Sequence, residues 1–367
     1  MTMSDVKTVL GLMSGTSLDG IDMAVLETDG EAHIKLQRDG FVPYSDSTRN
    51  LLRYLLDDTA AWPTEKMTNR ADWPDMLLEA EQAVTQAHLV AVREFIGEGE
   101  VALVGFHGQT ISHRPDEGFT LQIGSGQELA TALHCDVVGQ FRLADMAAGG
   151  QGAPLAPLFH AALAGEERPL GVLNLGGVGN LTWLGADDAI LAFDTGPANA
   201  LLDDWVKQKT GARYDEDGAL AMRGTVDEVA LATLMAHPYF DTKPPKSLDR
   251  LSFDGAAVLT LSDADGAATL TAFTVEAVAR GLAHCLEPPS KVIMCGGGRH
   301  NKALSEMLRA RTQIEFIDCD VLGWHGDSLE AQAFAWLAMR SVRKMPLSRP
   351  ETTGASEPVS GGILFRA

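Results

Sequence analysis

The sequence predicts an α/β fold with two lobes, each a mixed β-sheet covered by helices. Three observations support this prediction. The chain has 367 residues, which is too long for one ordinary core and suits two domains. Amphipathic helices alternate with short apolar runs, and the second half repeats a strand–turn–strand pattern of the first half.

The alternation of helix and strand is clearest at three places. A helix over residues 77–95 has apolar side chains at three- and four-residue steps and precedes an apolar strand at 101–104. A helix over 273–286 precedes a strand at 292–294, and a third helix near 304–308 precedes a strand at 314–317. This order is typical of sheets covered by helices.

The internal repeat joins residues 9–17 to residues 172–180, which share a hydrophobic rhythm and a small, glycine-rich turn. Each copy continues into another apolar run, at 23–26 and at 181–184. The copies lie about half the chain length apart, so we expect two lobes that arose by duplication.

Composition excludes several classes of protein. The formal charge of −21 and the scattered Lys and Arg residues argue against nucleic acid as a partner. Any phosphate must then be held locally, by backbone amides and a divalent cation. The four cysteines lack CxxC spacing and no apolar run reaches the length of a membrane span, so we expect a cytoplasmic protein with no membrane partner.

The turn at residues 11–22 links two strand-like runs and is rich in glycine and hydroxyl side chains. We expect residues 14–17 to lie at the strand tip, with their amides and hydroxyls exposed. Such a tip can surround an anionic oxygen without a lysine.

Asp194 ends a strand that begins near residue 190. Pro197 is expected at the first position of the following helix, which places Asp194 near a helix N-terminus and at the strand end where α/β proteins bind ligands. Asp194 is therefore either a cap of this helix or a catalytic carboxylate.

Two further segments follow predicted strands. Residues 295–298 contain three consecutive glycines, which would let the backbone lie against a nucleoside; a simple turn is the alternative. His107, Gln109 and Thr110 could bind a sugar through directed hydrogen bonds, although a lone histidine at a strand end is more often structural.

Three remaining segments have a purely structural interpretation from the residues alone. Asp327 and Glu330 have the spacing of a capping box. Arg142 and Asp145 could form a buried ion pair. Residues 246–250 are expected to form a solvated loop.

Taken together, these segments resemble the anhydro-N-acetylmuramic acid kinases, in the same order and over nearly the whole chain. The matching blocks are GLMSGTSLDGID, GFHGQTISH, GGQGAPL, NLGGVGN, FDTGPANALLDDW, PPKS, CGGG and EAQAFAWLA. One position departs from the family pattern, because Gln140 stands where members commonly have an aspartate.

The resemblance implies the acetate and sugar kinase, Hsp70 and actin architecture, with actin-like (ribonuclease H-like) lobes and an ATP cleft between them. The expected lobes are residues 1–137 with 352–367, and residues 138–351. The implied reaction opens the 1,6-anhydro ring of anhydro-N-acetylmuramic acid with water and phosphorylates O6, in peptidoglycan recycling. ATP, Mg²⁺ and a homodimer are implied with it.

The resemblance also assigns roles to particular residues. Asp194 matches the catalytic base. Glu330 matches a sugar-recognising glutamate, and His107, Gln109, Thr110 and Arg142 resemble sugar-side positions. Asp19 and Asp22 are candidate Mg²⁺ ligands, through water. The residues expected to bind ATP are Gly15, Thr16, Ser17, Leu18, Asp19, Gly20, Ile21, Asp22, Gly176, Gly177, Asn180, Gly296, Gly297 and Gly298.

Two other functions compete with this interpretation. One is a nucleotide-gated binding or filament protein of the same fold, in which no sugar is modified. The other is a kinase for a different sugar or a small carboxylic acid.

Overall fold

The computed structural model describes residues 6–15, 17–97, 99–248 and 252–367. It divides the chain into two compact units, unit 1 (Met1–Gly165 with Ser328–Ala367) and unit 2 (Glu166–Asp327). Two units were predicted, but the boundaries expected at 137/138 and 351/352 differ from these. Residues 138–165 and 328–351 were assigned to the second lobe but belong to unit 1. The reason is that helices of these segments pack on the rest of unit 1.

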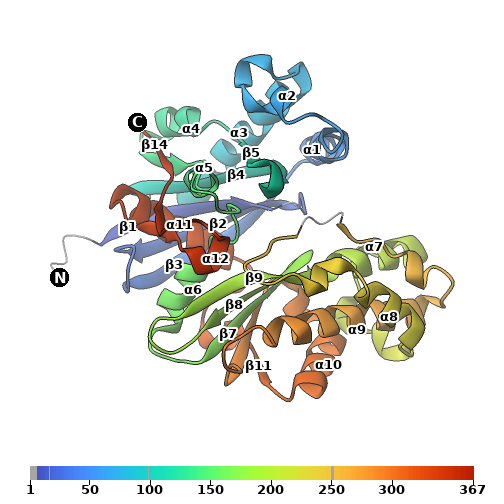
Figure 1. Cartoon of the computed structure of the whole chain (residues 1–367). Helices are drawn as coiled ribbons and strands as arrows, with labels where there is room; N and C mark the ends of the chain where they lie inside the picture. Colours follow the sequence, from blue (N-terminus) through green and yellow to red (C-terminus); the bar gives the residue numbers. More distant parts are fainter. Residues whose placement is uncertain (1–5, 16, 98, 249–251) are drawn as a thin grey trace. The chain divides into compact units, whose positions relative to one another are not determined.

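The sheet of unit 1 combines antiparallel and parallel strands (Figure 1). The strand order is β14-β6-β4-β1-β2-β3, and β5 pairs with β4. β2 runs antiparallel to its neighbours β1 and β3, whereas β1, β4 and β6 are parallel. The strands of this unit are β1 (Lys7–Ser14), β2 (Gly20–Thr28), β3 (Ile34–Pro43), β4 (Leu103–Arg114), β5 (Phe119–Ile123), β6 (Val137–Gly139), β12 (Pro346–Ser348), β13 (Val359–Ser360) and β14 (Ile363–Phe365).

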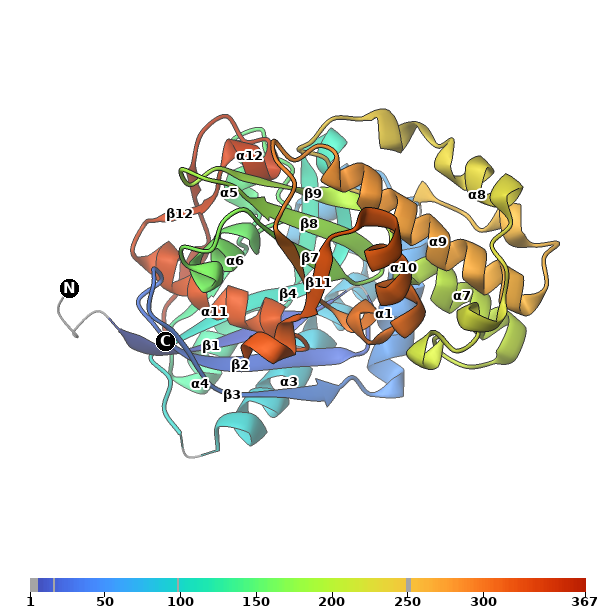
Figure 2. The ribbon, with the colours of Figure 1, turned by 90° about the horizontal axis from the view of Figure 1, so that it is seen from below.

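The helices of unit 1 are α1 (Asp46–Thr59), α2 (Glu65–Thr68), α3 (Asp75–Ile96), α4 (Gly126–Leu133), α5 (Leu143–Ala147), α6 (Pro157–Ala164), α11 (Leu329–Val342) and α12 (Pro350–Thr353). α3 confirms the helix predicted over 77–95. Figure 2 shows α11 beside β1 and β2, which it contacts. This approach needs glycine, because a Cβ on Gly11 would lie 1.8 Å from the Ala331 carbonyl oxygen.

The sheet of unit 2 repeats the connectivity of unit 1. Its order is β11-β10-β7-β8-β9, with β7, β8 and β9 antiparallel and β7, β10 and β11 parallel. The predicted repeat is thus confirmed at the level of topology, with β7 in the place of β1. The strands are β7 (Leu170–Leu175), β8 (Val178–Leu184), β9 (Ile190–Pro197), β10 (Lys291–Cys295) and β11 (Glu315–Asp318).

The helices of unit 2 are α7 (Asn199–Thr210), α8 (Glu228–Met235), α9 (Asp263–Leu282) and α10 (Lys302–Thr312). α9 packs against β8 and β9 (Figure 1). It starts ten residues before the predicted helix. The prediction missed the first turns because they are polar and contain a glycine; Ser262 caps them. Across the described parts of both units, helices that are long and apolar enough to cross a membrane are absent.

Candidate active site

The tip of the β1–β2 hairpin in unit 1 is the predicted phosphate-binding segment. Ser17 and Asp19 are exposed there. Ser14 was expected to expose its hydroxyl, and this is wrong: Ser14 is fully buried and its Oγ donates to the Gly108 carbonyl oxygen at 3.2 Å. Thr16 lies outside the described residues.

The hairpin tip is held in shape by hydrogen bonds from the surrounding chain. The Gly15 carbonyl accepts from the Leu18 amide at 3.2 Å and from Gln109 Nε2 at 3.1 Å. The Asp19 carbonyl accepts from the Tyr44 amide at 3.0 Å. Leu18 and Ile21 point into the core, so only their backbone can face a phosphate; Gly20 is also buried, and Asp22 is half-buried.

His107 is a buried member of β4 and contacts Arg142. The prediction that His107 lies at the end of its strand is wrong, because β4 continues to Arg114. Arg142 Nη2 lies 2.9 Å from His107 Nε2, and His107 Nδ1 lies 2.7 Å from the Gly108 carbonyl oxygen. Because guanidinium can only donate, Nε2 must accept and Nδ1 must carry the proton. Burial and the charge of Arg142 hold the pKa of His107 well below its usual value, which agrees with this neutral form.

Arg142 does not pair with Asp145, contrary to the structural interpretation of the sequence. It donates to the Gly152 carbonyl oxygen at 2.6 Å as well as to His107. Asp145 is buried and accepts from the Gly152 amide at 2.7 Å and from Thr353 Oγ1 at 2.6 Å. Asp145 therefore braces the backbone, and the guanidinium of Arg142 lies against His107.

Glu330 lies in the first turn of α11, in unit 1 and not in the second lobe where it was predicted. The expected capping box is absent from the described residues, because Ser328 is the N-cap residue and no side-chain hydrogen bond caps the helix. The side chain is solvent accessible. Desolvation nevertheless raises the pKa of Glu330, and the charge of Arg142 opposes the rise.

Gln109 and Thr110 follow on the same strand. Gln109 uses its Nε2 on the hairpin, and its buried Oε1 has no hydrogen-bond partner within the described residues. Thr110 Oγ1 accepts from Gln122 Nε2 at 3.3 Å, and Gln122 Oε1 is likewise buried and unpartnered within that part of the chain. Buried acceptors are normally satisfied, so these two suit hydroxyl donors. The sequence did not single out Gln122.

Asp194 lies on β9 of unit 2 and is half-buried. Its Oδ1 accepts from Asn180 Nδ2 at 2.8 Å, and its Oδ2 accepts from the Leu248 amide at 2.7 Å. The register shifts so that Gly179 faces Gly196 while Asn180 faces Asp194, which leaves one extra residue on β9. Such a bulge re-aims a side chain and is frequent next to active sites.

Asp194 does not cap α7, and Pro197 does not begin that helix. β9 runs through Pro197, which pairs with Val178. Proline is tolerated there because β9 is an edge strand and needs no outward donor. Ala198 occupies the N-cap position of α7. The capping alternative for Asp194 is thus wrong.

The turn at Gly176 and Gly177 faces the start of α7. The Asn199 amide donates to the Gly176 carbonyl at 3.0 Å, and the Ala198 amide donates to the Gly177 carbonyl at 3.0 Å. The turn therefore uses its carbonyl groups on the helix. Gly177 is exposed. Asn180, predicted to bind phosphate, uses its amide nitrogen on Asp194.

The glycines after β10 have unequal surroundings. A Cβ on Gly296 would lie 2.3 Å from Asn174 Oδ1, and one on Gly298 would lie 2.6 Å from the Leu175 Cβ. A Cβ on Gly297 would meet nothing within 4 Å, and this residue is exposed. Gly296 and Gly298 are therefore required by packing, whereas Gly297 leaves an open backbone face.

Arg299 braces this turn and was missed by sequence reasoning. Its Nη1 donates to the Gly296 carbonyl at 3.1 Å and to Asp327 at 2.7 Å, and its Nη2 donates to Asp320 at 2.9 Å. Burial opposes the charge of Arg299, but the hydrogen bonds to Asp327 and Asp320 raise its pKa above the ordinary value. The turn predicted to bind the nucleoside thus rests on a buried, fully charged guanidinium.

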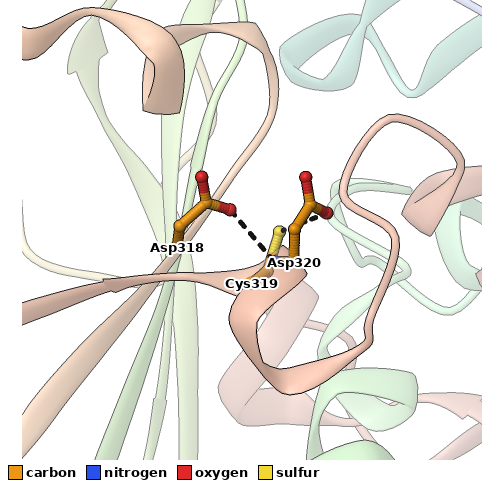
Figure 3. Close-up of side chains that lie close together, drawn as sticks. All are labelled: Asp318, Cys319 and Asp320. Carbon is orange, nitrogen blue, oxygen red and sulfur yellow. Dashed lines mark hydrogen bonds between the residues drawn. The ribbon is translucent and has the colours of Figure 1, made fainter.

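Asp318, Cys319 and Asp320 gather at the end of β11 (Figure 3), with potential ligand atoms within 4.8 Å of one another. Arg299 forms ion pairs with both aspartates, at 3.4 Å and 2.9 Å. A guanidinium already supplies the positive charge, and a thiol is a poor ligand for Mg²⁺. This cluster is therefore an ion-pair network that supports Arg299.

The predicted Mg²⁺ ligands are Asp19, exposed at the hairpin tip, and Asp22, half-buried on β2. Carboxylate oxygens beside a turn that is predicted to bind phosphate suit a hard cation that keeps several waters. The residue types therefore fit Mg²⁺.

Comparison with known proteins gives the family. A family model described as anhydro-N-acetylmuramic acid kinase matches residues 7–367. The chain is 49% identical to the anhydro-N-acetylmuramic acid kinase of Rhizorhabdus wittichii, over 97% of this chain and 98% of the relative. It is 48% identical to that of Methylobacterium nodulans, over 97% of this chain and 99% of the relative.

Similar solved structures are much more distant. They include the Acidaminococcus fermentans (R)-2-hydroxyglutaryl-CoA dehydratase component A, with 12% identity, TM-score 0.46, and coverage of 92% of this chain and 100% of that one. A ROK family glucokinase from Streptomyces griseus in complex with glucose and AMPPNP has 13% identity, TM-score 0.40, and coverage of 91% and 99%. The near full-length sequence matches show that this chain belongs to the anhydro-N-acetylmuramic acid kinase family.

Proposed function

We propose that this protein uses ATP to open the 1,6-anhydro ring of anhydro-N-acetylmuramic acid and to phosphorylate O6, giving N-acetylmuramic acid 6-phosphate and ADP in peptidoglycan recycling. Family membership supports the substrate and the reaction. The observation that carries the mechanism is the Asp194 carboxylate, which is held at both oxygens by Asn180 and Leu248.

Asp194 is suited to be the general base. Asn180 and Leu248 orient the carboxylate, and an ionised carboxylate is a base that can take a proton from water. A positioned base contributes about 10²- to 10⁴-fold to a rate.

The proposed reaction breaks one bond for each bond that it forms. Water attacks the anomeric carbon and gives its proton to Asp194, while the bond from C1 to O6 breaks. O6 then forms its bond to the γ-phosphorus, and ADP leaves. This combines the water activation of an inverting glycosidase with an in-line phosphoryl transfer.

Residues of both units are assigned to the ligands of this reaction. Arg142, held by His107, and Glu330 are the charged groups for the sugar. The side-chain oxygens of Gln109 and Gln122, which have no hydrogen-bond partner among the described residues, suit its hydroxyls. The hairpin from Gly15 to Asp22 and the turns at Gly176–177 and 296–298 are assigned to ATP.

We also propose a Mg²⁺ site, a homodimer and a cytoplasmic location. Asp19 and Asp22 would hold Mg²⁺, which neutralises charge on the phosphates when it is bound. The homodimer and the cytoplasmic location rest on the family resemblance and on composition. Gln140 stands where members of the family commonly have an aspartate, and its Nε2 donates to the Gln122 carbonyl at 3.3 Å. Because this replacement removes a charge beside Gln122, which we assign to the sugar, we expect an altered affinity for the sugar.

The proposal is tested with purified protein, ATP, Mg²⁺ and anhydro-N-acetylmuramic acid in H₂¹⁸O. We expect one ADP for each sugar phosphate, with ¹⁸O on C1 and none in the phosphate, as measured by mass spectrometry. ADP release without any need for sugar, together with ATP-dependent light scattering, would favour the nucleotide-gated protein. Faster phosphorylation of N-acetylglucosamine or a small acid would favour the other kinase.

A further inference from the structure

The segment from Tyr239 to Leu248 covers the open edge of β9 at Asp194. Because β9 is an edge strand, its outward backbone groups need partners from elsewhere. The Asp194 amide donates to the Lys246 carbonyl at 2.9 Å, and the Tyr239 hydroxyl donates to the Asp194 carbonyl. With the Leu248 amide on Oδ2, one segment holds both the backbone and the side chain of Asp194.

Lys246 ties the two ends of this segment together. Its Nζ donates to the Tyr239 carbonyl at 2.9 Å and lies 4.2 Å from the centre of the Tyr239 ring. The residue is only 6% exposed, which corrects the prediction of a solvated loop at 246–250; Arg250 lies outside the described residues.

A buried ammonium is costly unless charges and hydrogen bonds compensate it. Burial lowers the pKa of Lys246, and the charges of Asp241 and Asp194 oppose that change. An exposed lysine at this position would avoid the desolvation cost, so the buried arrangement needs another explanation. The contacts of Lys246 supply one, since they fix the segment that carries the Leu248 amide.

We infer that Lys246 is a positioning residue for Asp194, which it serves by locking Tyr239 and Leu248 in place around the proposed base. This inference rests on the proposed function. Lys246 acts through its neighbours, because its Nζ is buried against Tyr239. A displacement of about 1 Å in a reacting group can cost about 100-fold in rate, so the effect belongs in kcat.

The main test is Lys246→Met, which keeps most of the side-chain volume and removes the charge and the donor. We expect kcat to fall about 10- to 100-fold, with KM for ATP and for the sugar within about twofold of wild type. Amide-resolved hydrogen exchange at Leu248 should become faster, because its acceptor Asp194 is no longer held against it.

The matched control is Lys243→Met, a lysine three positions earlier that is exposed. It should leave kcat and the exchange of Leu248 unchanged. Tyr239→Phe provides a second variant that removes only the hydroxyl, and it should lower kcat about three- to tenfold. This milder variant keeps the test available if Lys246→Met does not fold.

Three results would overturn the inference. The first is a wild-type kcat in Lys246→Met or, if that variant does not fold, in Tyr239→Phe. The second is a raised KM for the sugar with unchanged kcat, which indicates a direct substrate contact, and the third is unchanged hydrogen exchange at Leu248. Failure of the proposed function is a separate result, because it appears as absent turnover in the wild-type protein. The hydrogen-exchange comparison still decides the role of Lys246 in that case.

Discussion

Two aspartates occupy matching positions in the two sheets and have different neighbours. When Val172 is aligned with Val9, Asn174 on β7 corresponds to Gly11 on β1. Strand pairing leads from Gly11 through Ala24 to Asp39 on β3, and from Asn174 through Asn180 to Asp194 on β9. Both are half-buried. Asp39 accepts from Ser328 Oγ at 2.6 Å and so anchors the start of α11, whereas Asp194 is held by Asn180 and Leu248.

From this difference we infer why the proposed chemistry belongs to one copy of the repeat only. In unit 1 the central strand has Gly11, and α11 packs directly on it. In unit 2 the aligned residue is Asn174, the neighbouring strand supplies Asn180, and the extra residue of the bulge re-aims β9. The same register therefore places a structural carboxylate in one unit and the proposed general base in the other.

The strongest test of this comparison is Asp194→Asn. We expect kcat to fall roughly 10³-fold or more, because the amide cannot take the proton of water. The fold and the affinity for ATP should be retained, as measured by circular dichroism and nucleotide titration. Wild-type turnover in this variant would remove Asp194 from its assigned role.

The glycine turn after β10 gives a second contrast, between Gly297→Ala and Gly296→Ala. Gly297 has open space around it, so its variant should keep its stability within about 0.5 kcal/mol. If a nucleoside lies against the turn, KM for ATP should rise about tenfold, equivalent to about 1.4 kcal/mol. An unchanged KM would place the nucleoside elsewhere.

Gly296→Ala is the structural counterpart of that variant. Gly296 has a φ of +73°, and a Cβ there would lie 2.3 Å from Asn174 Oδ1. We expect a loss of about 1 to 3 kcal/mol in the free energy of unfolding, measured by thermal or urea denaturation.

Acid should weaken unit 1 more than unit 2 through the buried histidines. Burial lowers the pKa of His88 and His160 in unit 1 to about 4. Between pH 6.5 and 4 these histidines are protonated in the unfolded chain but stay neutral in the native protein. The free energy of unfolding is therefore highest above pH 6.5 and decreases as the pH falls. Each pKa unit corresponds to about 1.4 kcal/mol.

Hydrogen exchange at pH 7.5, 6 and 5, corrected for intrinsic rates, measures this effect separately in each unit. Replacement of His88 by Phe should reduce the pH dependence in unit 1, and replacement of the exposed His134 by Asn should not. An equal response of both units in the wild-type protein would contradict the assignment to the histidines.

The smallest effect is expected from Asp39→Asn, the matched control for Asp194→Asn. Turnover should stay within about twofold of wild type. Loss of the charge-assisted hydrogen bond from Ser328 should cost about 1 to 2 kcal/mol in stability. A large loss of kcat with no change in stability would mean that the two carboxylates do not differ as their neighbours indicate.

Local patterns in the sequence determined much of this protein: the helix at α3, the repeated strand–turn–strand units, the glycine turns and the resemblance to its family. These features depend on periodicity and on residues close together in the chain. The position of Asp194 on a strand was also predictable.

Tertiary structure alone decided what surrounds those residues. Leu248 binds Asp194 from 54 positions away, Lys246 is buried where the sequence indicated a solvated loop, and Glu330 belongs to unit 1 because α11 packs on Gly11. Spacing along the chain cannot reveal such contacts, because they form only when packed layers bring distant segments together and buried polar groups must find partners there.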